Sequence, residues 1–241
     1  MGGYGEKDGS VIRGVGLGGL VMVSTRFGKK DLKHMRNTFA SLQGRVLDIG
    51  CGDMLDRIGF SPGDEYVGVD ITKSKYSVAL TDIHKLPFKN DSFDSCICNA
   101  VLEHIREPGV ALCECNRILK NGGVLWVSVP FLQHIHADYD FRRFTGQGLT
   151  YEVEKAGFIV DRLHGSYGVM DNIEYLLYSA VGWRIAKDKD YKKIGSFVYC
   201  IMLAILFVMF NALGFIFNRQ QKRDVHHATS FDIIAHKNRG M

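Results

Sequence analysis

The clearest chemical signal in the chain is a short apolar run that leads into a turn of the form Asp-x-Gly-x-Gly, within residues 45–53. The run favours a strand, and the turn contains Asp48, Gly50, Cys51 and Gly52. Glycines lack the Cβ atoms that would keep a ligand away from the backbone. The pattern therefore predicts a turn that holds a charged nucleoside close to the main chain.

The carboxylate of Asp48 indicates which nucleoside binds to this turn. Phosphates bind best to bare amides at a helix N-terminus, whereas a carboxylate favours a cation. S-adenosylmethionine carries a positive amino group and a positive sulfonium, so the turn favours it over NAD or ATP. A second acid, Asp70, ends the apolar segment 66–70 and lies 22 residues after Asp48. At that distance the carboxylate of a second strand can accept both ribose hydroxyls.

Further segments extend this pattern. Asp82 and Ile83, just before a Leu-Pro-Phe segment, provide an acceptor and a backbone amide that could read the edge of an adenine. Segments 93–98 and 124–130 favour a fourth and a fifth strand. Asn99 directly follows the fourth strand, and we include it among the predicted cofactor-binding residues.

This ordered series of motifs resembles a class I S-adenosylmethionine-dependent methyltransferase of the type-11 family. The resemblance covers roughly 33–158 and the segment 231–237. It implies that the glycine-rich turn holds the methionine part of the cofactor, that Asp70 holds the ribose, and that Asp82 and Ile83 hold the adenine.

The chain departs from the family pattern in one place. Many members have a further glycine after the second one, whereas Asp53 and Met54 stand here, and only about ten residues separate the turn from Pro62. We therefore expect the first crossover helix to be short.

Alternating strands and helical segments predict an α/β fold. We expect the Rossmann-like, seven-stranded doubly wound sheet of class I methyltransferases, with a hydrophobic helical insertion before the last strand at 230–237. Helices are expected at 31–43, 108–120 and 145–156, and Phe158 opens a sixth strand. The predicted divisions are a flexible N-terminal arm at 1–29, the cofactor-binding core at 30–170, a membrane-associated insertion at 171–225, and the final strand with the C-terminus at 226–241.

Composition limits the other possibilities. The 241 residues are 46% hydrophobic, which suffices for one substantial core. The net charge of +4 is mild, and no Lys/Arg run contains interleaved aromatic residues, so nucleic acid is not a favoured partner. The six cysteines form no C-x-x-C pair, so we expect buried free thiols and no metal site.

The segment 134–145 is dense in ionisable side chains and follows a central strand, where open α/β sheets bind substrates. It resembles a segment of type-11 methyltransferases near glycan-assembly enzymes. A hydroxyl acceptor needs a base, and His136 is the best candidate, with Asp140 orienting it or replacing it. His104 is a weaker candidate. Alternatively, Asp140 and Arg143 form a salt bridge that only shapes the loop.

Residues 196–217 contain no charged side chain. A helix of this length would extend about 33 Å, which is enough to cross a hydrocarbon core. Lysines and arginines flank it on both sides, so the charges give no orientation. A single crossing would separate the final strand from the rest of the sheet. We therefore favour a monotopic protein with both termini on the cytosolic side of a membrane over a single-pass protein, and a cytoplasmic protein remains an alternative.

The family resemblance, together with the apolar segment, implies a methyltransferase that O-methylates a polar acceptor at a membrane, such as a lipid-linked glycan. One alternative is a methyltransferase acting on a quinone or a lipid headgroup. Another is a membrane-tethered scaffold that binds the cofactor without catalysis.

Overall fold

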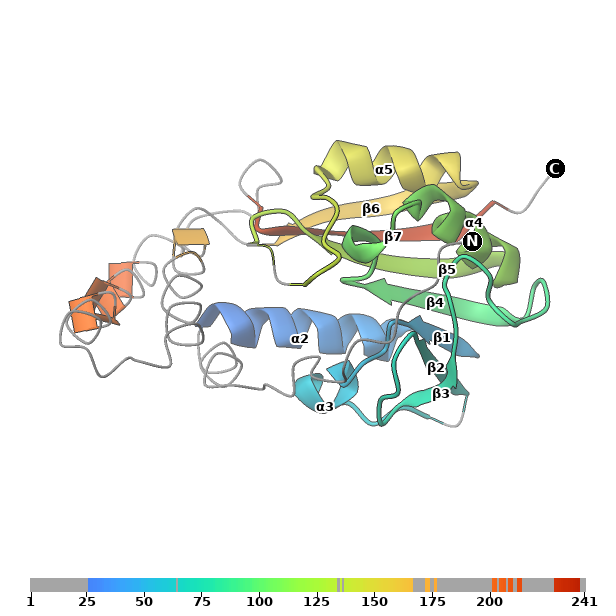
Figure 1. The fold of residues 1–241 in the computed structure, drawn as a ribbon, viewed down its shortest axis with the longest axis horizontal. Coiled ribbons are helices and arrows are strands. Elements are labelled where there is room, and N and C mark those ends of the chain that lie inside the picture. Colours follow the sequence, from blue (N-terminus) through green and yellow to red (C-terminus); the bar gives the residue numbers. More distant parts are fainter. Residues whose placement is uncertain are drawn as a thin grey trace.

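The computed structural model describes residues 26–63, 65–133, 135, 137–166 and 228–238, and within the insertion 172–173, 176, 201–202, 204–206, 208–209 and 212–213. These residues form a seven-stranded sheet with helices on both faces (Figure 1). The prediction of a doubly wound α/β sheet is confirmed. The first 25 residues of the predicted N-terminal arm lie outside the described residues.

The strands are β1 (Val46–Ile49), β2 (Tyr66–Asp70), β3 (Ser77–Leu80), β4 (Phe93–Asn99), β5 (Leu119–Pro130), β6 (Phe158–Ser166) and β7 (Ser230–Lys237). Their order in the sheet is β3-β2-β1-β4-β5-β7-β6. The first five strands pair in parallel, whereas β7 runs antiparallel to both β5 and β6. The order reverses between β1 and β4, and open α/β sheets bind ligands at such a point, beyond the carboxyl ends of the strands.

The helices are α2 (Arg26–Ser41), α3 (Met54–Ile58), the 3₁₀ turn η1 (Leu102–His104), α4 (Pro108–Ile118) and α5 (Gly146–Lys155). The first crossover helix, α3, is short, as the close spacing between the turn and Pro62 predicts. Helix α2 begins five residues before the predicted start at Asp31. Its first turn has no acidic residue and contains Gly28, so the sequence carries no start signal there. At α5 the side chain of Thr145 accepts the N–H of Gly148 at 3.0 Å, as expected for its cap.

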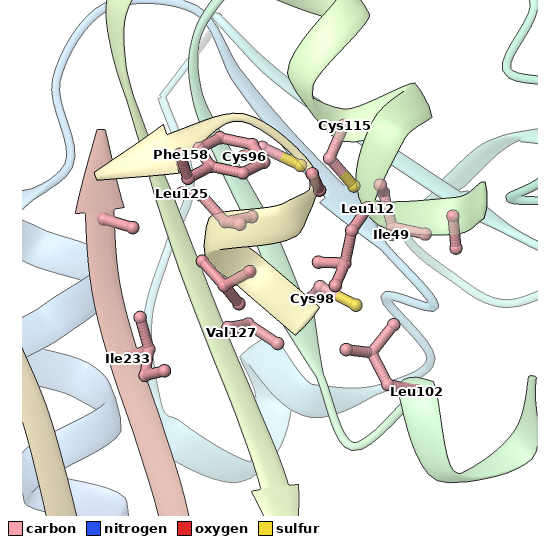
Figure 2. Packing of buried hydrophobic residues seen from close by; sticks show 14 of the residues in the cluster. Ile49, Cys96, Cys98, Leu102, Leu112, Cys115, Leu125, Val127, Phe158 and Ile233 are labelled. Atoms are coloured by element: carbon pink, nitrogen blue, oxygen red, sulfur yellow. The ribbon is translucent and has the colours of Figure 1, made fainter. Parts of the chain in front are cut away.

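Helices α4 and α5 cover the face of the sheet that holds the larger core (Figure 2). Cys96 and Cys98 of β4 lie in this core with Leu112 and Cys115 of α4. The five cysteines that the structure describes are free, and all except Cys113 are buried. The prediction of buried thiols is confirmed for those four.

Helices α2 and α3 cover the opposite face. Phe39 of α2 packs edge-to-face on Trp126 of β5, with ring centroids 5.6 Å apart. Leu55 and Ile58 of α3 complete this smaller core. These contacts fix α2 across β4 and β5, so the helix before the first strand is part of the folded core.

The predicted helical insertion lies between β6 and β7 in the chain, and most of it is outside the described residues. The described residues of 201–213 are helical. Among them Ile205 and Val208 are 61% and 66% exposed, and Ile201, Met202 and Met209 are also exposed. The insertion therefore presents apolar side chains to its surroundings.

Candidate cofactor and acceptor site

The turn after β1 has the backbone that its glycines allow. Gly50 and Gly52 have φ angles of +68° and +44°, which favour glycine. A Cβ at Gly50 would lie 2.4 Å from the side chain of Val101, whereas a Cβ at Gly52 would meet no atom within 4 Å. The turn is therefore closed against Val101 at Gly50 and open at Gly52. Backbone N–H groups of Gly50 and Cys51 donate to the carbonyl of Val69 at 2.8 and 3.2 Å, which ties the turn to β2.

Asp70 at the end of β2 reaches across to this turn. One carboxylate oxygen accepts the N–H of Gly52 at 3.0 Å. The other accepts the backbone N–H and the hydroxyl of Thr72 at 2.9 and 3.1 Å. Three donors therefore hold the carboxylate beside the open part of the turn.

Asp48 lies beneath the turn and is only 2% exposed. The hydroxyl of Tyr66 donates to it at 2.7 Å. Burial raises the pKa of Asp48 from 3.8 to about 7; the Tyr66 bond opposes this rise, and the nearby charge of Asp70 adds to it. The charge of Asp48 therefore depends on what is bound nearby. Its partner Tyr66 was not identified from the sequence.

Cys51 occupies the middle of the turn with its side chain buried. Its sulfur lies 3.6 Å from the hydroxyl of Ser74. Burial raises the pKa of the Cys51 thiol to about 11, so the thiol is protonated at neutral pH. Its contribution to a ligand would come from the backbone of the turn rather than from a thiolate.

The two residues predicted to contact the adenine, Asp82 and Ile83, lie in different environments. Asp82 is exposed, and its carboxylate accepts the backbone N–H of His84 at 2.9 Å and contacts the ring nitrogen of His84 at 2.6 Å. Ile83 is 3% exposed and belongs to the larger core. Ile83 thus anchors the loop, and the polar groups at its edge belong to Asp82 and the backbone.

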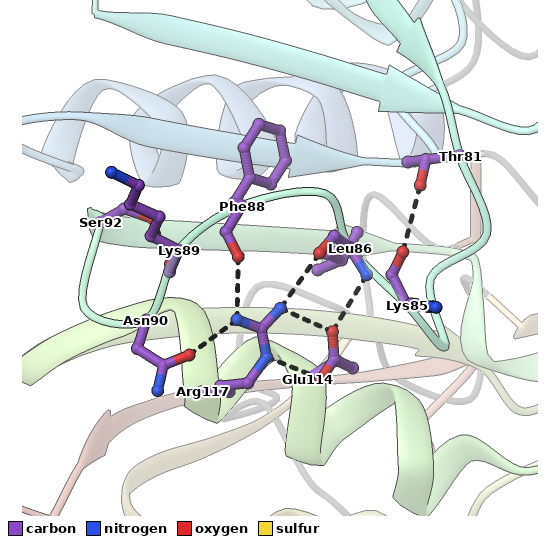
Figure 3. Close-up of polar contacts among 9 residues, drawn as sticks. All are labelled: Thr81, Lys85, Leu86, Phe88, Lys89, Asn90, Ser92, Glu114 and Arg117. Carbon is purple, nitrogen blue, oxygen red and sulfur yellow. Dashed lines mark hydrogen bonds and ion pairs between the residues drawn. The ribbon is translucent and has the colours of Figure 1, made fainter.

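A clamp from α4 holds the chain that follows this pair (Figure 3). The guanidinium of Arg117 donates to the carbonyls of Phe88 and Leu86 at 2.8 and 3.1 Å, and to the side chain of Asn90 at 2.8 Å. Glu114 accepts Nε of Arg117 at 2.8 Å and the backbone N–H of Leu86 at 3.0 Å. No local sequence pattern indicates this clamp, because its two halves lie about 30 residues apart and match no motif.

The end of β4 contains an unusual backbone conformation. Asn99 is buried, and Ala100, directly after it, has a φ of +53°. Non-glycine residues rarely adopt this conformation, and when they do, they cluster at functional sites. The N–H of Ala100 donates to the carbonyl of Ser128 at 2.8 Å. This bend directs Val101 under Gly50, so β4 supports the cofactor turn from the other side.

Part of the predicted acceptor loop packs on η1. The N–H of Phe141 donates to the carbonyl of Glu103 at 2.8 Å, and Nδ1 of His104 lies 2.5 Å from the carbonyl of Tyr139. The side chain of Asp140 is 1% exposed, and both its oxygens bond the guanidinium of Arg143, one of them at 2.8 Å. The salt bridge between Asp140 and Arg143, which was the alternative to a catalytic role for this loop, is thus present. His136 lies outside the described residues.

Glu103 is a residue whose environment the sequence did not predict. Its side chain is fully buried, and in the described part of the chain neither carboxylate oxygen has a hydrogen-bond partner. Nε2 of His104 is 3.7 Å away. Burial raises the pKa of Glu103 to about 7, although the charges of His104 and Arg143 oppose the rise. A buried acid of this kind next to the acceptor loop is typical of functional sites.

The glycine turn and the acids near the ends of β1 and β2 thus lie at the carboxyl edge of the sheet, and residues 47–127 match the family model of the methyltransferase domain. This chain contains a type-11 methyltransferase domain. The matched part of the methyltransferase domain runs from β1 to β5, so it includes the turn, Asp70, Asp82 and the end of β4.

Curated relatives are similar over part of their length. An uncharacterized methyltransferase of Schizosaccharomyces pombe is 32% identical over 116 residues, covering 38% of this chain and 40% of that protein. A ubiquinone biosynthesis O-methyltransferase of Alkalilimnicola ehrlichii is 30% identical over 111 residues, covering 38% of this chain and 44% of that protein. The matched region spans less than half the length of these relatives.

Solved structures share the fold of the methyltransferase domain. An S-adenosylmethionine-dependent methyltransferase of Thermotoga maritima superimposes with a TM-score of 0.54 at 16% identity, covering 91% of this chain and 93% of that one. The [4+2]-cyclase SpnF gives a TM-score of 0.59 at 17% identity, covering 88% and 82%. The prediction of a class I S-adenosylmethionine-dependent methyltransferase domain is confirmed in family and fold.

Proposed function

We propose that the protein is an S-adenosylmethionine-dependent methyltransferase that uses the turn at 48–52 as its cofactor site. The observation that carries this proposal is Asp70, which three donors hold beside the open side of Gly52. A fixed carboxylate there fits a pair of ribose hydroxyls, because it can accept two charge-assisted hydrogen bonds. The space at Gly52 fits a ligand that lies against the backbone.

The other predicted cofactor residues fit the same ligand. Asp48, with a pKa of about 7, is a carboxyl that a nearby cation would ionise. Asp82 and the backbone at Ile83 would read the adenine, since the Arg117 clamp fixes the chain just beyond them. The backbone of Cys51 and the side chain of Asn99 complete the proposed set.

When bound, S-adenosylmethionine supplies a methyl group on a positive sulfonium. Transfer of this group is an in-line displacement, so the protein contributes mainly by positioning the acceptor and excluding water. A hydroxyl acceptor must also lose its proton, and we propose His136 as the base. Both oxygens of Asp140 are engaged by Arg143, so we propose that Asp140 shapes the loop that presents His136.

We propose that the acceptor is carried by a membrane lipid, with a hydroxyl of a lipid-linked glycan as the leading candidate. The exposed apolar residues of 201–209 support contact with lipid, because large exposed apolar patches mark interaction sites. None of the helices in the part of the chain that the structure describes has the combined length and hydropathy of a membrane span. We propose that the insertion lies on the cytosolic surface of the membrane or dips into it, because a single crossing would separate β7 from the rest of the sheet.

A second candidate acceptor is a quinone. It is favoured by several relatives that are named ubiquinone biosynthesis O-methyltransferases, at 28–33% identity. Quinone precursors also combine a hydroxyl with an apolar tail, so the exposed insertion fits them equally well.

A third candidate is a scaffold that binds the cofactor without methyl transfer. It is favoured by SpnF, which shares the fold and is named a cyclase, because a fold alone does not determine chemistry.

One labelling experiment separates these candidates. The purified protein is incubated with membranes and methyl-labelled S-adenosylmethionine, and lipids are then extracted and separated. Label in a lipid product that mild acid converts to a water-soluble glycan supports the leading acceptor. Label in a quinone fraction supports the second candidate. No transfer by a protein that binds the cofactor would favour the scaffold.

A further inference from the structure

We propose that His34, His164 and Asp232 form a binding site for one divalent transition-metal ion, with zinc as the natural probe. The three residues come from α2, β6 and β7, and their possible ligand atoms all lie within 4.8 Å of one another. The cluster lies on the face of the sheet that α2 covers, and the proposal does not depend on methyl transfer. The sequence predicted no metal site, and this proposal differs from that prediction.

The distances are close to those that a metal needs. Nε2 of His34 lies 3.1 Å from one oxygen of Asp232, and Nδ1 of His164 lies 2.8 Å from the other. Zinc binds histidine nitrogens and carboxylate oxygens at about 2.0–2.2 Å in a tetrahedron, which separates neighbouring ligand atoms by roughly 3.3 Å. Both His–Asp separations are near this value, and the two histidine nitrogens lie no more than 4.8 Å apart, so metal binding would require the rings to move toward one another.

The chemical types of the three ligands narrow the choice of ion. Two imidazoles with one carboxylate suit zinc, iron and other first-row transition metals, whereas calcium and magnesium prefer oxygen ligands. The two rings are near each other, with centroids 4.6 Å apart. Three protein ligands would leave a fourth position for water.

The buried charge of Asp232 gives an independent reason. The side chain is 5% exposed, and each of its two oxygens faces an imidazole nitrogen. A buried carboxylate needs a positive partner. Among the described residues its contacts are two imidazoles and the indole N–H of Trp126, so a histidine proton or a metal ion would supply the positive charge at this cluster.

Metal-bound carboxylates usually accept a hydrogen bond from a neighbouring residue outside the ligand set, and Trp126 provides such a bond here. Its indole nitrogen lies 3.5 Å from the oxygen of Asp232 that faces His34. Such outer hydrogen bonds orient a ligand and raise its affinity for the metal. The side chains of His34 and His164 are 26% and 15% exposed, so an ion can reach the cluster from solvent.

The test is a zinc titration of the full-length, tag-free protein after treatment with EDTA, followed by calorimetry and by the melting temperature. We expect one equivalent of zinc to bind with micromolar or tighter affinity and to raise the melting temperature, because the ion binds the folded state. His34→Gln, His164→Gln and Asp232→Asn should each abolish this equivalent. Trp126→Phe should weaken it by about 10-fold.

His236→Gln is the matched control. His236 also lies on β7 and contacts an aspartate, Asp161, at 2.8 Å, but this pair is solvent-exposed and is not part of the three-residue cluster. Zinc binding should be unchanged in this variant. The proposal fails if the wild-type protein binds no zinc, or if the three ligand variants still bind it, since histidines elsewhere would then be responsible. The wild-type titration decides the question even if a ligand variant does not fold.

Discussion

The N–H of Gly52 donates to the carboxylate of Asp70 at 3.0 Å and so joins the turn after β1 to the end of β2. This bond holds the proposed ribose acceptor beside the open part of the turn. We therefore expect that substitutions that loosen the end of β1 or of β2 weaken cofactor binding.

The Arg117 clamp should control cofactor affinity without touching the cofactor. Arg117→Lys removes the planar group that bonds the chain at 86–90 and leaves a single ammonium. We expect stability to fall by about 1–2 kcal/mol, since the side chain is partly exposed, and cofactor affinity to fall several-fold. Urea unfolding and calorimetry measure the two effects. Arg162→Lys, at an exposed arginine of β6, should change neither; equal losses in both variants would show that the clamp has no special role.

Stability should fall as pH rises from about 4 to about 7. The folded-state pKa values of Asp48 and Glu103 are both raised to about 7. In this range the unfolded chain loses these protons while the folded protein keeps them, so ionisation favours unfolding. The raised pKa values thus contribute stability at low pH that is lost as pH rises through 7. Asp232 acts in the opposite sense and only below about pH 4, because its pKa is lowered to about 2.

Asp48→Asn isolates one of these groups. It keeps an acceptor for the hydroxyl of Tyr66 but cannot ionise. The wild-type free energy of unfolding should fall by a few kcal/mol between pH 4 and pH 7, and the variant should lose roughly half as much. Urea midpoints across this range give the comparison. A variant with the full wild-type slope would show that Asp48 is not the titrating group.

His136→Asn should cut turnover by about 10²-fold or more and leave cofactor affinity intact, because general bases contribute about 10²–10⁴-fold. Asp140→Asn should instead lower stability together with turnover, since it breaks the buried pair with Arg143. Steady-state kinetics and thermal unfolding distinguish the two patterns. Wild-type turnover with asparagine at position 136 would exclude this residue as the base.

Membrane topology gives a further prediction. Strand β7 pairs with β5 and β6, so the chain on both sides of the insertion shares one compartment. Tags at residue 1 and residue 241 should therefore both resist an external protease in intact cells, while the protein pellets with membranes. Digestion of the C-terminal tag from outside would establish a single crossing. A protein found only in the supernatant would contradict membrane association.

The sequence predicted the parts of the fold that depend on local patterns. The strand that leads into Gly50, the cap at Thr145 and the final strand at 230–237 are each encoded by residue types within a few positions. Strand β3 was not located, because it is a short edge strand and alternates between exposed and half-buried residues.

Contacts between distant residues could not be predicted in this way. His34 and Asp232 lie 198 residues apart, and no spacing rule connects them. The Arg117 clamp and the bond between Tyr66 and Asp48 likewise appear only once the strands are aligned. For the proposed site, the carboxylates could be predicted from the sequence, whereas the groups that orient them could be identified only from the fold.

The most direct test of the central claim is calorimetric titration of S-adenosylmethionine into the purified protein and its Asp70→Ala variant. We predict micromolar binding by the wild-type protein and a loss of roughly 2–4 kcal/mol in the variant, because hydrogen bonds to a charged group are removed. Asp53→Ala, at the exposed acid just beyond the turn, should bind like the wild type. Equal affinity of wild type and Asp70→Ala, or no binding by either, would contradict the proposed cofactor site.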